Sequence, residues 1–320
     1  MNKFNITSPS FGHPSKRGVN FRCKNTRFKS EVLKIFMILF VNSWPLIINS
    51  NVYSQSAELI FIQQKEIELQ KLFDSLSITK IDSIKLNINE TIKENLSDIF
   101  RNQESYEYPF SKIKYLGKTL SDDGFLRVYN WNIPMSDFTN KCFGFVQFKD
   151  KKLFRTEFLD DKFTEIENPE RANLSPENWY GALYYQAIAS DYKRTRYYVL
   201  LGWRGKNEFI SQKVVDALEI DKNGEMKFNS PVFRAGNDKK KRLIFEFSSR
   251  VSMSLRYDEI YKMIVYDHLS PAKPMYTGQK QYYGPDFSYD GLEYEKGKWT
   301  ELIDIDIKSP KKPTSKKTNN

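Results

Sequence analysis

An acid stands beside a rare histidine in KMIVYDHLSP, residues 262–271: Asp267 and His268 are adjacent, and the only other histidine of the 320-residue chain is His13. A histidine that acts as a general base needs a carboxylate to orient it and a nucleophile or water to deprotonate. A second acid, Asp258, lies a few residues upstream in SMSLRYDE. The candidate catalytic residues are therefore His268, Asp267 and Asp258, and the chemistry that they suit is hydrolysis of a glycan or peptide.

The spacing of these residues argues against a simple catalytic arrangement. Adjacent residues of a strand point to opposite faces, so Asp267 cannot orient His268 if residues 263–268 form one strand. The sequence contains no GxSxG motif, and Cys142 lies in the apolar run KCFGFVQF, which is typical of a buried, unreactive thiol. We expect instead that His268 is a structural residue at the end of a strand, hydrogen-bonded to a turn formed by the following Leu-Ser-Pro.

Metal binding is a second possible chemistry, because acids are frequent in the C-terminal third of the chain. The nearest approach to a calcium loop is Asp286 and Asp290 followed by Gly291, and the remaining ligand positions of such a loop are missing. A zinc or iron site normally uses more than one histidine. We expect no metal and no cofactor.

Aromatic residues provide a third possibility, since an exposed aromatic platform can stack on sugar rings. The residues that we select as candidate ligand contacts are Trp203, Tyr282, Tyr283, Asp286 and Asp290. The alternative is that these aromatic side chains fill the core of a β-rich protein.

Two kinds of element must position these residues. Apolar residues recur at helical spacing over residues 57–101, with a break at residues 77–79 and Thr79 or Asp82 as the N-cap of the second helix. The sequence therefore predicts an antiparallel pair of amphipathic helices within residues 55–107.

From residue 108 the pattern changes to aromatic and β-branched runs separated by turn signals such as Asn223-Gly224. The runs that we expect to form strands are KIKYLGKTL, FLRVYNWNI, CFGFVQF, KLFRTEFL, WYGALYYQAIA, TRYYVLLGW, KRLIFEFSS, VSMSLRYDE, KMIVYDHL and KWTELIDIDI. The fold class is thus α+β, with the helix pair followed by a large antiparallel β-meander domain over residues 108–307. Sandwich, barrel and propeller-like arrangements all remain open.

The N-terminal residues 1–54 have the composition of a signal peptide. A basic flank precedes an apolar stretch of about 14 residues, which is shorter than the roughly 20 residues of a transmembrane helix. Small residues suit cleavage between Ser54 and Gln55, and no cysteine follows for a lipoprotein anchor. We expect a periplasmic or secreted protein without a transmembrane span in its mature chain; the alternative is a buried core helix.

The positive charge of the chain is concentrated at its two ends. The formal net charge is +10, but residues 1–54 hold eight basic residues and one acid, and residues 308–320 hold five lysines and no acid. The region between them is close to neutral, so we expect no nucleic-acid partner. The Lys-rich residues 308–320 contain no large apolar side chain and are expected to be disordered.

The motifs YYVLLGWRG, SMSLRYDE, IVYDHLSP and YYGPDFSYDG together resemble a group of exported proteins of Bacteroidota that has no established activity. The resemblance covers most of residues 110–307 and implies export, and it carries over no catalytic residue. Arg204 stands where the family's GW-x-G turn often has an acid, which argues against a metal in that turn. Because the chain has the composition of a signal peptide and no recognisable catalytic constellation, we expect a non-enzymatic exported protein with a binding or structural role, whose partner is an envelope glycan or another envelope protein. The alternatives are an exported hydrolase that uses His268 with nearby acids and a carbohydrate-binding module.

Overall fold

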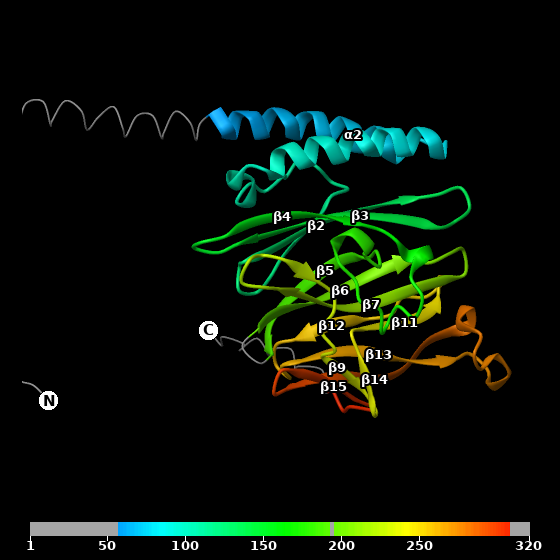
Figure 1. The fold of residues 1–320 in the computed structure, drawn as a ribbon. Coiled ribbons are helices and arrows are strands. Elements are labelled where there is room, and N and C mark those ends of the chain that lie inside the picture. Colours follow the sequence, from blue (N-terminus) through cyan, green and yellow to red (C-terminus); the bar gives the residue numbers. More distant parts are fainter. Residues whose placement is uncertain (1–56, 193–194, 308–320) are drawn as a thin grey trace, which may run out of the picture. The chain divides into compact units, whose positions relative to one another are not determined.

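A computed structural model describes residues 57–192 and 195–307. It has two helices within residues 57–100, followed by a large, mainly antiparallel β-rich region of three sheets, so the protein is α+β (Figure 1). The expected signal peptide, its cleavage site and the Lys-rich tail lie outside the described residues. None of the helices in the described residues is long and apolar enough to cross a membrane.

The two helices form a hairpin. The first covers residues 57–78, and α2 (Asp82–Phe100) follows after a three-residue turn. The Lys65 Nζ atom donates to the Asn95 Oδ1 atom at 2.9 Å, which fixes the antiparallel pairing. The predicted N-caps were wrong: the N-cap of α2 is Ile81, whose side chain makes no capping bond. The Asp82 carboxylate instead accepts a hydrogen bond from the Ser136 hydroxyl at 2.6 Å, which connects α2 to the loop at residues 135–139.

Each sheet is a run of mostly consecutive strands. In the first sheet the order is β1 (Gly117–Leu120), β2 (Leu126–Pro134), β3 (Asn140–Lys149), β4 (Phe154–Asp160). In the second it is β11 (Arg242–Ser248), β7 (Ile210–Ile220), β6 (Thr195–Gly205), β5 (Leu183–Tyr192), with β8 (Met226–Lys227) beside β7. In the third it is β10 (Asp238–Lys240), β9 (Phe233–Ala235), β15 (Lys298–Leu302), β14 (Tyr283–Glu295), β13 (Met263–Pro271), β12 (Leu255–Asp258). The pairing is antiparallel except between β15 and β9.

Three apolar cores hold the helices and sheets together as layers (Figure 1). In strands of the first and second sheets, alternate residues enter different cores, as the period of a strand requires. In β2, Val128 packs toward the second sheet, whereas Tyr129 packs against the helices. In β6, Tyr198 faces the first sheet and Val199 faces the third. The second sheet is therefore buried on both faces, which explains the uninterrupted apolar run in YYVLLGW.

Two expected turns, one after His268 and one at Arg204, lie within strands, and one strand was not expected at all. The Leu-Ser-Pro segment after His268 is not a turn, because β13 continues to Pro271 and pairs there with residues 283–285 of β14. Between Asp267 and Leu269 the register shifts, and β14 bulges at Phe287, whose φ angle is 74°. No strand was predicted for residues 210–220, which form β7. Arg204 lies within β6 rather than in a turn.

Candidate functional site

The histidine singled out from the sequence pairs with an acid on the neighbouring strand. The Nδ1 atom of His268 in β13 lies 2.7 Å from the Oδ2 atom of Asp290 in β14. The other oxygen of Asp290 accepts from the backbone N–H of Asp304 at 3.0 Å. The Asp290 side chain is nearly buried, with 9% exposed, whereas the His268 side chain is 38% exposed. The pair is thus a fixed carboxylate that orients a partly accessible imidazole.

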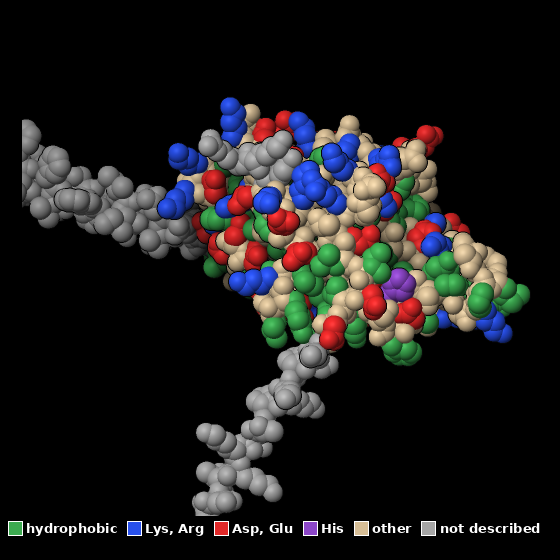
Figure 2. Space-filling view, turned by 90° about the horizontal axis from the view of Figure 1, so that it is seen from below, with side chains coloured by type: hydrophobic (Ala, Val, Ile, Leu, Met, Phe, Trp, Pro, Cys, Tyr) green, Lys and Arg blue, Asp and Glu red, His purple; other side chains and the backbone are tan. Residues whose placement is uncertain are grey.

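Carboxylates around His268 favour its protonated form. The hydrogen bond that Asp290 accepts raises the pKa of His268, and the charges of Asp290, Asp286 and Asp304 act in the same direction, against the desolvation of the ring. Hydrogen bonds, chiefly from the Ser288 hydroxyl, lower the pKa of Asp286 and keep it ionised. Figure 2 shows the histidine, in purple, at the surface with carboxylates in red beside it.

The side chains of the other two catalytic candidates, Asp267 and Asp258, accept hydrogen bonds from the backbone rather than from His268. The Asp267 Oδ2 atom accepts from the Ser254 backbone N–H at 2.6 Å. Asp258 accepts from the backbone N–H groups of Ile260 and Tyr261 at 3.0 and 3.2 Å, closing the turn between β12 and β13. Its cross-strand partner is Met263, five residues and about 17 Å of strand away from His268. The structure therefore does not bring the three candidates together.

No nucleophile is hydrogen-bonded to His268 among the described residues. The nearby Ser288 hydroxyl donates to the Asp286 Oδ1 atom at 2.8 Å. Cys142 is buried, and burial raises the pKa of its thiol to about 12, so it is not a thiolate at neutral pH. Within residues 57–192 and 195–307, no group of three or more His, Cys, Asp or Glu side chains is arranged to hold a metal ion.

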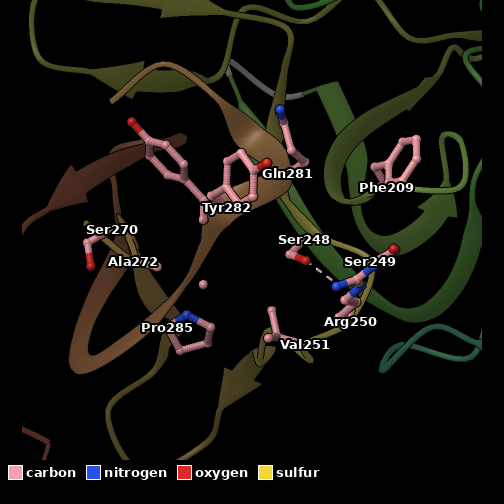
Figure 3. A pocket seen from close by; sticks show the side chains of 12 residues that line it. Phe209, Ser248, Ser249, Arg250, Val251, Ser270, Ala272, Gln281, Tyr282 and Pro285 are labelled. Atoms are coloured by element: carbon pink, nitrogen blue, oxygen red, sulfur yellow. Dashed lines mark hydrogen bonds between the residues drawn. The ribbon is translucent and has the colours of Figure 1, made fainter. Parts of the chain in front are cut away.

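A groove of about 560 Å³ opens beside this pair, between the second and third sheets (Figure 3). One wall is formed by Phe209, just before β7, and by residues 248–251, at the end of β11 and directly after it. The other wall is the long extension of the β13–β14 hairpin, which contains the short helices η4 (Pro274–Tyr276) and η5 (Lys280–Tyr282). The lining residues are Phe209, Ser248, Ser249, Arg250, Val251, Ser270, Ala272, Gln281, Tyr282, Tyr283, Gly284 and Pro285.

Aromatic rings of this groove are held in place by their neighbours. The rings of Tyr282 and Tyr276 stack with centroids 4.2 Å apart. The Tyr283 hydroxyl accepts from the Gly278 backbone N–H at 2.9 Å, and the Lys280 Nζ atom lies 4.2 Å from the centre of the Tyr283 ring. Phe209, on the opposite wall, remains 54% exposed. The groove thus combines fixed apolar faces with hydroxyl, amide and guanidinium groups that can form hydrogen bonds.

A buried ion pair fixes the strands that carry one wall. Asp216 of β7 and Arg242 of β11 are cross-strand partners with fully buried side chains, and the Arg242 Nε atom lies 3.2 Å from the Asp216 Oδ1 atom. The other oxygen of Asp216 accepts the Tyr184 hydroxyl at 3.0 Å. Arg242 also donates to the carbonyl oxygens of Pro169 and Phe228. This network fixes the register of β7 against β11, and with it the relative positions of Phe209 and residues 248–251.

The candidate ligand contacts from the sequence divide into three groups. Tyr282 and Tyr283 line the groove. Asp286 and Asp290 lie around His268, and Ser270, two residues after His268, reaches the groove. Trp203 is neither in the groove lining nor among the charged groups around His268, because it packs against the core between the second and third sheets.

Several groove residues could not be selected from the sequence alone. Phe209, Arg250, Val251 and Gln281 lie in polar connecting segments that show no motif. The only signal for them is the presence of apolar residues, Phe209 and Val251, in otherwise polar connections.

Comparisons with models of protein families, with curated proteins and with solved structures found no match to this chain. The resemblance to exported proteins of Bacteroidota therefore stays an expectation from the sequence. The function must be argued from the geometry of the groove and of the His268–Asp290 pair.

Proposed function

We propose that this protein is an exported, non-enzymatic binding protein that holds a segment of an envelope glycan in the groove beside β13 and β14. The observation that carries the proposal is the lining of the groove. Tyr282, Tyr283 and Phe209 offer apolar ring faces, and Arg250, Gln281 and three serines offer polar groups. Sugars present the same combination, since their C–H faces stack on aromatic rings and their hydroxyls need hydrogen-bond partners. Export rests on the composition of residues 1–54.

The rings are held in place and yet remain exposed, which supports a role in ligand binding rather than in core packing. Tyr282 remains 43% exposed although it stacks on Tyr276. A ring that is already packed loses little conformational entropy when a ligand covers its open side. The groove is also open to solvent, and its volume of about 560 Å³ is within the usual range for ligand sites.

The test is a glycan array probed with the purified protein, followed by calorimetric titration of the best ligand. Tyr282→Ala should weaken binding about tenfold or more, because stacking and burial of one aromatic ring contribute at least ~1.4 kcal/mol. The matched control is Phe138→Ala, which removes a ring that is 60% exposed in the loop between β2 and β3. The control should bind like the wild type. An array without any bound glycan, or equal losses in the two variants, contradicts the proposal.

The His268–Asp290 pair supports one second candidate, an exported hydrolase that acts on a glycan or peptide. The Asp290 carboxylate orients the imidazole through Nδ1, as the acid of a catalytic triad does, and a water molecule would have to take the place of a nucleophilic side chain. Release of soluble fragments from polymeric substrate, abolished by His268→Ala while circular dichroism shows an intact fold, would establish the hydrolase. Unchanged substrate in the presence of wild-type protein rejects it.

A further inference from the structure

The turn between the two helices carries an exposed apolar surface. Ile78, Ile81 and Ile84 project from the turn and the first turn of α2, and Tyr115 projects from the segment before β1; we call these four residues the helix-turn patch. Their exposed fractions are 80%, 59%, 45% and 54%, respectively. The turn between the two helices lies at one end of the helix hairpin (Figure 1). Clustered exposed apolar side chains of this kind mark an interaction site more often than isolated ones do.

A pocket of about 380 Å³ opens beside the helix-turn patch, and Tyr115 of the patch lines it. Leu76, Ser77 and Thr79 line it as well, which shows that the helix turn and the segment before β1 are neighbours. Phe73, Trp131 and Ile133, all nearly fully buried, form apolar parts of its wall. Lys85 also lines the pocket, and its amine is held by the Asp82 carboxylate and the Pro134 carbonyl oxygen. The pocket therefore offers an occupant apolar contacts, the neutral polar side chains of Ser77, Thr79 and Asn132, and no free charge.

Two lysines flank the helix-turn patch. Lys80 lies within the turn and Lys114 precedes Tyr115; both are exposed, and neither has an acidic partner within the described parts of the chain. Protein interfaces are depleted in lysine, whereas surfaces that lie on phospholipid combine apolar side chains with lysines whose amines reach the headgroups. The combination of isoleucines, a tyrosine and unpaired amines therefore favours a lipid surface over a protein partner.

We propose that the helix-turn patch docks on a phospholipid bilayer. The side chains of Ile78 and Ile81 enter the boundary between headgroups and acyl chains, and the amines of Lys80 and Lys114 lie at the phosphates. Part of an acyl chain occupies the pocket beside Trp131. The docking is peripheral and reversible, because three isoleucines and one tyrosine bury far less apolar surface than a membrane-spanning helix. It is independent of the groove, which lies between the second and third sheets.

Flotation of the purified protein with phosphatidylcholine vesicles, with and without phosphatidylglycerol, tests this inference. The wild type should float with both kinds of vesicle and more strongly with the anionic kind. The double variant Ile78→Ser/Ile81→Ser should lose at least about tenfold in its partition coefficient. The matched control is Ile260→Ser/Ile303→Ser, which changes two isoleucines that are each 69% exposed elsewhere, and it should float like the wild type.

Brominated acyl chains provide a second measurement that does not depend on a variant with altered isoleucines. The brominated chains should quench the part of the tryptophan fluorescence that comes from Trp131. In Trp131→Phe this quenching should be absent. Wild-type protein that floats with neither kind of vesicle overturns the proposal, as does equal loss in the two double variants. Concentration-dependent self-association that Ile78→Ser/Ile81→Ser abolishes, without any flotation, would assign the patch to a second copy of the chain and also overturns it.

Discussion

Replacing Asp216 by alanine should lower the free energy of unfolding by about 3–5 kcal/mol. In the wild type, the two carboxylate oxygens accept from the Arg242 guanidinium and the Tyr184 hydroxyl, and both side chains of the ion pair are fully buried. Alanine leaves the Arg242 charge buried beside two carbonyl oxygens without a counter-charge. For a protein of this size, a loss of 1 kcal/mol lowers the melting temperature by about 2–4 °C. The expected drop in melting temperature is therefore on the order of 6–20 °C.

Urea and thermal unfolding followed by circular dichroism measure this effect, and a double variant supplies the control. Asp216→Leu/Arg242→Met removes both charges, and replacing a buried ion pair by apolar residues is often close to neutral. The double variant should therefore be more stable than Asp216→Ala. A loss below about 1 kcal/mol in the single variant, or a double variant that is less stable than the single one, would refute the view that the pair fixes β7 against β11.

Three further predictions concern other parts of the chain. Gly181→Ala should lower the free energy of unfolding more than Gly124→Ala does, as urea unfolding of the two variants would show. Both glycines have positive φ angles (82° and 76°), but only at Gly181 would a Cβ atom collide with the buried Arg204 and Asp161 side chains. Cys142 should resist alkylation at pH 8 until the protein unfolds, since burial raises the pKa of its thiol to about 12; peptide mass mapping checks this. The raised pKa of His268 means that its pair with Asp290 stabilises the fold below about pH 6.5 and loses that contribution as the pH rises through the raised value. The difference in unfolding energy between wild type and His268→Gln should thus shrink from pH 5.5 to 9, by less than about 1 kcal/mol because the side chain is partly exposed.

The class of the fold could be predicted because its main signals are local. Helical spacing before residue 101 and period-two runs after residue 108 correspond to the helix hairpin and the antiparallel sheets. β7 was missed because Gln212, Lys213 and Asp216 interrupt the apolar pattern of ISQKVVDALEI. The fully buried Asp216 is compatible with a central strand only through its contact with Arg242, 26 residues later in the chain.

The candidate site was only partly predictable, for a related reason. Strand alternation is a local property, and it led to the inference that Asp267 does not orient His268; the Ser254 contact of Asp267 accords with this. The partner of His268 is Asp290, whose position depends on a register shift and a bulge in β14 that no local pattern encodes. Likewise, Phe209 and Tyr282 line one groove only because two distant loops meet.

The most direct test of the central claim is calorimetric titration of wild-type protein, Tyr282→Ala and Phe138→Ala with an envelope glycan fragment bound on the array. The account predicts that Kd rises about tenfold or more for Tyr282→Ala and stays at the wild-type value for Phe138→Ala. Wild-type affinity in Tyr282→Ala, with its fold intact by circular dichroism, would contradict the assignment of the groove as the ligand-binding site.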